Sequence, residues 1–168
     1  MGKKIRLAGI AYESLVNGPG MRRVFFSQGC KHKCRGCFNP DTHSFSSGEE
    51  MDMDELIEDV LDNPILKGVT FSGGDPIERA EEFSYMAKKF KENGLSVWSF
   101  TGYTMEYLLE HLEEMKGVKE LFENLDVLID GKFEKDLMEE GLKFKGSSNQ
   151  RTIDVRETLK QNKIILVE

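Results

Sequence analysis

The three cysteines of this 168-residue chain all fall within one short segment. They are Cys30, Cys34 and Cys37, in the spacing Cys-x3-Cys-x2-Cys, so their thiolates can converge on one metal centre. Ordinary [4Fe-4S] electron-transfer sites use four cysteines. A cluster held by only three leaves one iron open to a small molecule, and an open metal position is typical of a reactive site rather than a closed structural one.

Structural zinc is the alternative interpretation of the same cysteines. Tetrahedral zinc sites with three cysteines and one histidine are common. His43 is a feasible fourth ligand, whereas His32 lies between two of the cysteines and would have to turn back on a very short loop. The tight clustering argues against three buried cysteines without a metal, but the spacing alone leaves both metals open.

A glycine-rich segment, Ser72-Gly73-Gly74-Asp75-Pro76, follows an expected strand and precedes an expected helix. Two glycines let the backbone approach a ligand closely, and their carbonyls can accept hydrogen bonds from an ammonium group. The same residues also make a good helix start, with Asp75 as N-cap and Pro76 in the first turn.

Two further segments follow expected strands. Thr101 precedes Gly102 and is either a ligand contact or a turn residue, and Asp130 and Lys132 flank Gly131. A lysine there can pair with a carboxylate while the aspartate orients it or reaches a ribose; the alternative is a solvated surface turn.

The expected elements alternate between strand and helix. The pattern predicts strands over 5–12, 23–27, 68–71, 95–100 and 126–130, helices over about 52–63, 76–93, 104–115 and 118–123, and short strands over 151–155 and 164–167. This alternation predicts an α/β fold with a mostly parallel sheet. A closed eight-stranded barrel usually needs about 200–250 residues or more, so we expect an open, partial β/α barrel in a single domain, 1–168.

The candidate residues share one placement in this fold. The cysteine segment, the glycine pair, Thr101 and the Asp130 segment all leave the carboxyl ends of expected strands, where parallel α/β folds bind their ligands. Four unrelated segments would not be expected to share this placement.

Composition excludes several classes of function. The net charge is −7, the pI is about 5.1, and the basic residues are scattered among more acidic ones, which argues against a nucleic-acid partner. No 18-residue stretch is apolar, so we expect no membrane span. The beginning of the chain lacks the pattern of a secretory signal, which favours the cytoplasm. The odd cysteine count argues against a disulfide framework.

The cysteine spacing after an early strand resembles the signature of the radical S-adenosylmethionine superfamily. Many members of that superfamily carry an aromatic residue just before the last cysteine; this chain has Gly36 there and Phe38 just after Cys37. The segment Gly73-Gly74-Asp75-Pro76 resembles the Gly-Gly-Glu-Pro motif that contacts the amino group of the cofactor.

Other segments narrow the resemblance to the activating enzymes of glycyl-radical proteins. These are Asn17-Gly-Pro-Gly-Met-Arg22 and the Asp-x-Lys pattern of Asp130 and Lys132. The segment 146–151, Gly-Ser-Ser-Asn-Gln-Arg, resembles the activating proteins of anaerobic ribonucleoside-triphosphate reductases. A flexible turn and a polar loop are the alternatives for the first and last of these segments.

The resemblance implies a radical oxidoreductase in which a [4Fe-4S] cluster on Cys30, Cys34 and Cys37 cleaves S-adenosylmethionine to methionine and a 5′-deoxyadenosyl radical. That radical then takes hydrogen from a glycine of the large anaerobic ribonucleotide reductase, with reduced flavodoxin or ferredoxin as the electron donor, and no side chain acts as acid or base. The implied cofactor contacts are Gly36, Cys37, Phe38, Gly73, Gly74, Asp75, Thr101, Asp130 and Lys132.

Three alternatives stand beside this interpretation. Pyruvate formate-lyase activators and deazapurine synthases use similar cores, although the former are usually longer and the latter bind a small pterin-like substrate. The third alternative is a zinc-stabilised protein-binding module without catalysis.

Overall fold

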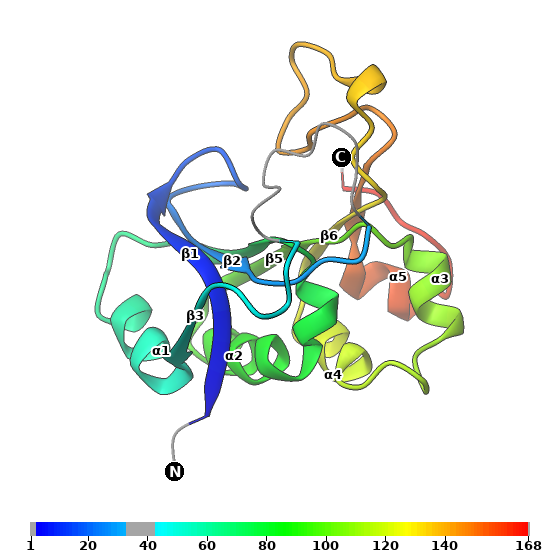
Figure 1. The fold of residues 1–168 in the computed structure, drawn as a ribbon. Coiled ribbons are helices and arrows are strands. Elements are labelled where there is room, and N and C mark those ends of the chain that lie inside the picture. Colours follow the sequence, from blue (N-terminus) through cyan, green and yellow to red (C-terminus); the bar gives the residue numbers. More distant parts are fainter. Residues whose placement is uncertain (1–2, 33–42, 168) are drawn as a thin grey trace.

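The computed structural model describes residues 3–32 and 43–167. Seven strands form one sheet that is not closed, in the order β3-β1-β2-β4-β5-β6-β7 (Figure 1). Their bounds are β1 Lys4–Ser14, β2 Arg22–Ser27, β3 Glu49–Asp52, β4 Gly68–Gly73, β5 Ser96–Phe100, β6 Val127–Asp130 and β7 Arg151–Asp154.

The four central strands, β2, β4, β5 and β6, pair in parallel. At one side β1 is antiparallel to β2, and β3 is antiparallel to β1, so β3 runs in the same direction as β2. At the other side β7 is antiparallel to β6. The prediction of an α/β protein with an open, mostly parallel sheet is therefore confirmed.

Helices and short 3-10 turns connect the strands. They are α1 Met53–Leu61, η2 Pro76–Arg79, α2 Ala80–Glu92, α3 Met105–Glu110, α4 Val118–Glu123, η3 Lys135–Leu137 and α5 Val155–Gln161. The Asp52 carboxylate caps α1 by accepting from the backbone N–H groups of Asp54 and Glu55, and the Thr104 hydroxyl accepts from the backbone N–H of Tyr107 in α3. Both caps lie at the first residues of the helices expected over 52–63 and 104–115.

The sequence prediction was wrong for some helices and strands. The helix expected over 104–115 ends at Glu110, and the chain continues as turns up to Gly117, the left-handed residue (φ +85°) that precedes α4. The segment 164–167 makes only an isolated bridge, between Leu166 and Ile153. The elements β3 and α5 were not predicted, and β3 is acidic; it forms because it pairs with the basic start of β1, where Arg6 lies opposite Glu50.

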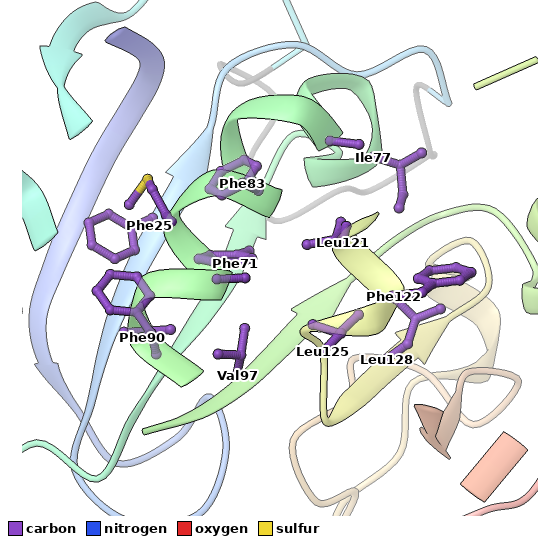
Figure 2. Packing of buried hydrophobic residues seen from close by; sticks show 14 of the residues in the cluster. Phe25, Phe71, Ile77, Phe83, Phe90, Val97, Leu121, Phe122, Leu125 and Leu128 are labelled. Atoms are coloured by element: carbon purple, nitrogen blue, oxygen red, sulfur yellow. The ribbon is translucent and has the colours of Figure 1, made fainter. Parts of the chain in front are cut away.

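One face of the sheet is covered by α1, α2 and α4 (Figure 1). Figure 2 shows Phe83 and Phe90 of α2 packed against Phe25 and Phe71 of the sheet, and the rings of Phe71 and Phe83 lie 4.4 Å apart between centroids. Burying a side chain of this size stabilises the fold by about 1.5–3 kcal/mol. This packing fixes the strands and therefore the loops at their ends.

A smaller apolar cluster lies on the opposite face, over β5 and β6. It contains Trp98, Val127 and Ile129, with Phe100 and Phe144 packed against them. Phe144 belongs to the long loop between β6 and β7, drawn yellow to orange in Figure 1, which lies on the side of the sheet away from α2 and α4. Both faces of β5 and β6 are thus covered, as is usual for parallel strands. None of the described helices is long and apolar enough to cross a membrane.

Candidate functional site

A cavity of about 410 Å³ lies at the carboxyl ends of the parallel strands. The loop after each of the four central strands contributes to its wall, and so does the long loop between β6 and β7. Its lining residues are Val16, Asn17, Phe26, Cys30, His32, His43, Ser72, Gly73, Gly74, Phe100, Thr101, Gly102, Gly131, Phe133, Leu142, Phe144, Lys145, Gly146 and Gln150. The structure therefore brings together Cys30, the glycine pair and Thr101, which the sequence suggested as one site.

The Asp75 carboxylate joins three of these loops. It is fully buried, and its Oδ2 accepts hydrogen bonds from Thr101 Oγ1 at 3.0 Å and from Gly102 N at 2.9 Å. His32 Nε2 lies 2.6 Å from the same oxygen, and Oδ1 accepts from Ile77 N at 3.0 Å. Asp75 does not line the cavity. Asp75 lies behind the cavity wall, where its bonds to His32, Thr101 and Gly102 fix the position of the cysteine segment relative to the loop after β5.

His32 was considered in the sequence only as a zinc ligand. In the structure its side chain is 7% exposed and its ring packs edge-on against Tyr103, with centroids 4.6 Å apart. The Tyr103 hydroxyl donates to Glu78 at 2.5 Å, and burial together with this bond raises the pKa of Tyr103 above its ordinary value. The pairing of Nε2 with Asp75 is a contact that no local sequence pattern indicates.

A wider hollow of about 1170 Å³ adjoins the cavity and shares His32, Gly102, Gly131 and Phe133 with it. Asp130 and Lys132 line this hollow rather than the smaller cavity.

Within this hollow, Asp130 is buried at 1% exposure and accepts from Met105 N at 2.8 Å and from Arg151 Nε at 3.0 Å. Arg151 also donates to Glu106, and this bond lowers the pKa of Glu106. The pKa of Arg151 is raised by its bonds to Asp130 and Glu106.

The segment 17–22 is held by the buried guanidinium of Arg22. It donates to Thr70 Oγ1 at 2.9 Å, to the carbonyl of Pro19 at 2.9 Å and to the hydroxyl of Ser96 at 2.8 Å. Burial lowers the pKa of Arg22 to about 10, so it stays protonated at neutral pH. The Thr70 hydroxyl in turn donates to the carbonyl of Asn17, which fixes that residue at the cavity wall.

The segment 146–151 forms a loop that is hydrogen-bonded to itself and to the β6 loop. Gln150 Oε1 accepts from Gly146 N at 2.8 Å, and Gln150 Nε2 donates to the carbonyl of Gly131 at 3.0 Å. Asn149 Nδ2 donates to the carbonyl of Lys132 at 2.8 Å. This polar segment therefore closes one side of the cavity with a defined conformation.

The cysteine segment is described only up to His32. Cys30 is buried at 8% exposure, and its backbone N–H donates to the carbonyl of His43 at 3.2 Å. The other predicted ligands and contacts, Cys34, Gly36, Cys37 and Phe38, lie outside the described residues. Residues 3–32 and 43–167 contain no group of three or more His, Cys, Asp and Glu side chains that could hold a metal.

Two features concern the packing of the strand ends below the cavity. The hydroxyl of Ser27, at the end of β2, is buried and has no hydrogen-bond partner within the described part of the chain. Gly73 has a left-handed φ of +97°, and a Cβ there would lie 2.4 Å from Ser27 N. Only glycine lets these two strand ends come together below the cavity.

Comparison with known proteins identifies the family. The model of a 4Fe-4S single-cluster domain matches residues 16–153. The anaerobic ribonucleoside-triphosphate reductase-activating protein of Vibrio cholerae is 38% identical over 81% of this chain and 89% of its own length. The proteins of the same name from Enterobacteria phage T4 and Escherichia coli K12 are 39% and 35% identical, over 81% of this chain and 85% and 90% of their own lengths.

The chain belongs to the family of anaerobic ribonucleoside-triphosphate reductase-activating proteins. The resemblance stated from the motifs is confirmed. The matched range contains every described residue of the cavity wall, from Val16 to Gln150. Because the family model describes a 4Fe-4S domain, membership in this family favours an iron–sulfur cofactor over structural zinc for the cysteine segment.

Proposed function

We propose that this protein reductively cleaves S-adenosylmethionine at a [4Fe-4S] cluster and generates a glycyl radical on an anaerobic ribonucleoside-triphosphate reductase. The observation that carries the proposal is the shared wall of Cys30 and the Gly73-Gly74 pair in one cavity at the strand ends. Relatives that cover most of the chain carry the name of such activating proteins. A cavity of this volume is within the range of small-molecule sites, about 300–1,000 Å³.

The residues present suit the cofactors that the family implies. Cys30, Cys34 and Cys37 supply three thiolates for the cluster, one fewer than an ordinary electron-transfer site uses. The chemistry that the bound cluster and cofactor supply is one-electron cleavage of the carbon–sulfur bond, which gives methionine and a 5′-deoxyadenosyl radical. The role left to the protein is to bind and orient the cofactor and to shield the radical from water, and we assign no side chain the role of acid or base.

The glycine loop is the proposed contact for the cofactor's amino group. Gly73 and Gly74 line the cavity without a side chain, so a bound ammonium group can approach their backbone closely. Thr101 lines the same cavity while its hydroxyl donates to Asp75. Asp75, with its oxygens occupied, supports this contact from behind. Gly36, Cys37 and Phe38 complete the proposed contacts from the cysteine segment.

An apolar wall surrounds the proposed site of radical formation. Phe26, Phe100, Phe133 and Phe144 all line the cavity. Aromatic rings exclude water, and exclusion of solvent prevents side reactions. This composition suits a radical that must survive until it meets its protein substrate.

The wider hollow is the proposed entry for that substrate. It adjoins the cavity through His32, Gly102, Gly131 and Phe133, and it is large enough for an extended loop of the reductase. Asp130 and Lys132 line it and are proposed contacts on this side of the cofactor.

Three further predictions from the sequence remain proposals. We propose that the open sheet is the partial barrel of the superfamily and that the protein acts in the cytoplasm without a nucleic-acid partner. We also propose that reduced flavodoxin or ferredoxin supplies the electron.

The test is activation of the reductase in vitro. Protein reconstituted anaerobically with iron and sulfide is mixed with the large reductase, S-adenosylmethionine and a low-potential reductant. We expect an electron paramagnetic resonance doublet from a glycyl radical, together with 5′-deoxyadenosine. Absence of both products from protein that holds a complete cluster contradicts the proposal, and zinc without iron or sulfide in anaerobically purified protein supports the binding-module alternative.

A further inference from the structure

Cys30 belongs to the walls of two separate hollows. It lines the cavity, and it also lines an open depression of about 460 Å³ whose other described lining residues are Lys31, His43, Ser44 and Phe45. The cavity is the proposed place of the cofactor, and the wider hollow is the proposed entry of the protein substrate. An electron that must reach the cluster while both are occupied needs another approach, and the depression at Cys30 offers one.

An exposed aromatic ring lies at this depression. Phe45 is 42% exposed although its side chain is large and apolar. A Cβ at Gly29 would lie 2.6 Å from the Phe45 ring, so the ring packs directly on the backbone that leads into Cys30. The ring therefore offers an apolar contact to a partner protein next to the first predicted cluster ligand.

The segment that carries Phe45 is fixed by hydrogen bonds to its backbone. Arg79 donates to the carbonyl of Phe45 at 3.2 Å, and Gln28 Nε2 donates to the carbonyl of Ser44 at 2.6 Å. A surface that is already ordered loses less conformational freedom when a partner binds. The exposed ring is thus presented on a preorganised surface.

Positive charge lies beside the ring. The Lys31 side chain is 67% exposed, and Arg79 donates only to carbonyl oxygens within the described residues. The carboxylate nearest to Lys31 is that of Glu78, 3.4 Å from its ammonium, and the Glu78 side chain is only 9% exposed. The lysine rather than the glutamate is therefore presented to a partner.

The charges of the flanking residues leave this balance positive. Arg6 pairs at 3.5 Å with Glu50, one of two acids that follow the segment; the other is Glu49. The undescribed residues 33–42 carry, by sequence, two cations and one acid, which are Lys33, Arg35 and Asp41. The chain as a whole has a net charge of −7, so this excess of cations is local. Complementary charge steers association, so the surface fits an acidic partner.

We propose that Lys31 and Phe45 dock the electron donor, a small acidic electron-transfer protein such as flavodoxin. The proposal deepens the proposed function and rests on it, since it takes a cluster on Cys30 as the electron acceptor. One electron passes from the reduced donor to the oxidised cluster, so the donor is oxidised and the cluster reduced by one charge each. No bond forms or breaks in this step.

The test measures reduction of the cluster in the reconstituted holoenzyme with two reductants. One is reduced flavodoxin in a stopped-flow experiment. The other is the 5-deazariboflavin radical generated by flash photolysis, which is small and uncharged and needs no docking surface. We expect Lys31→Glu to lower the second-order rate constant with flavodoxin by about fivefold or more at low salt. This difference should vanish near 1 M salt, where the Debye length is about 3 Å.

Phe45→Ala should lower the rate constant with flavodoxin by about tenfold at low and high salt alike, because an aromatic contact is not screened by ions. Both variants should react with the deazaflavin radical as the wild type does. Calorimetric titration with oxidised flavodoxin gives a second measurement that needs no electron transfer, and both variants should bind more weakly. Lys31→Gln and Phe45→Leu provide milder changes should either variant fail to take up a cluster.

Lys163→Glu and Leu159→Ala are the matched controls. Lys163 is exposed, Leu159 is 40% exposed, and neither lines the depression, the cavity or the wider hollow. Both controls should match the wild type with either reductant and in the titration.

Two results overturn the proposal. One is an unchanged rate constant with flavodoxin in the variants of both Lys31 and Phe45, and the other is a loss of the same size with the deazaflavin radical. The proposed function fails separately, if the chemically reduced wild-type holoenzyme yields no 5′-deoxyadenosine from S-adenosylmethionine.

Discussion

The Nε2 atom of His32 lies 2.6 Å from Oδ2 of Asp75, and this pair joins the cysteine segment to the glycine loop. The same oxygen accepts from Thr101 and Gly102, so one buried carboxylate sets the relative positions of three cavity loops. A carboxylate that is fully buried is costly to leave unpaired. The interaction therefore fixes where Cys30 lies relative to Gly73 and Gly74, and breaking it should be measurable in both stability and cofactor binding.

Replacement of Asp75 by asparagine should destabilise the cluster-free protein by about 2–3 kcal/mol, because an amide turns one acceptor into a donor that faces other donors. Urea unfolding measures this loss. His32→Leu should also lower the free energy of unfolding. Its effect should not add fully to that of Asp75→Asn, since both changes break the same interaction between His32 and Asp75. His32→Gln, which keeps an N–H donor, should recover part of the loss. Fully additive effects would contradict the pairing.

His111→Leu is the control for His32→Leu, because His111 lies outside both hollows and its ring stacks on Tyr107 in the same helical turn, with Nδ1 2.7 Å from the Tyr107 carbonyl oxygen. We expect its free energy of unfolding to stay within about 0.5 kcal/mol of the wild type, as for most changes away from special sites. Equal losses in the two variants would show that His32 has no special role.

Gly102→Ala tests the same interaction by steric means. A Cβ at Gly102 would lie 2.4 Å from the His32 ring, which must then move away from Asp75. We expect a loss of about 1–3 kcal/mol, the usual range for overpacking, and weaker S-adenosylmethionine binding by the holoenzyme. Gly9→Ala is the control, because nothing lies within 4 Å of its added Cβ. Wild-type stability and binding in Gly102→Ala would contradict the placement of His32.

Arg22→Met should be among the most destabilising changes in the chain. It removes the donors for the buried Thr70 hydroxyl and Val69 carbonyl and leaves these acceptors without that partner, which costs about 1–3 kcal/mol for each group. Guanidinium chloride unfolding should show a loss of at least about 3 kcal/mol. Arg6→Met, at a half-buried residue with longer contacts, should cost about 1 kcal/mol or less. Similar losses at the two positions would show that the turn does not depend on Arg22.

The local architecture was largely predictable from the sequence, since it depends on local signals. Apolar runs predicted the central strands, and the two helices expected to begin at 52 and 104 do begin there, after the N-caps Asp52 and Thr104. Long-range pairing was not predictable: β3 is acidic and forms only because β1 lies beside it. The helix expected to Met115 was too long because periodicity alone does not detect the turns that follow Glu110.

In the candidate site, too, the features that depend on local signals were predictable and the long-range contacts were not. The placement of loops at strand ends follows from the alternation of elements, and the structure brings Cys30, Gly73, Gly74 and Thr101 to one cavity. The partners of buried charges depend on three-dimensional contacts that no short motif encodes. The pairing of Asp130 with Arg151, 21 residues further along the chain, is one example.

The Arg151 cluster should make stability sensitive to acid. Arg151 holds the pKa of Glu106 below its ordinary value of 4.5. A depressed pKa stabilises the folded state above the ordinary pKa, and this contribution is lost as pH falls through the lower, folded-state pKa. Because the Glu106 side chain is 54% exposed, the contribution should be at most about 1 kcal/mol.

Urea unfolding of the wild type and of Glu106→Gln measures this contribution. We expect the wild type to be more stable at pH 7 and the difference to shrink towards pH 3. A difference that grows on acidification would contradict this assignment.

Production of 5′-deoxyadenosine tests the central claim most directly. Wild-type protein and the variants Cys30→Ala, Cys34→Ala and Cys37→Ala are reconstituted anaerobically, reduced and supplied with S-adenosylmethionine, and the nucleoside is measured by chromatography. The account predicts product from the wild type and only background from each variant, because loss of any thiolate removes a ligand from the cluster. Product at the wild-type level from any one of the three variants would contradict it.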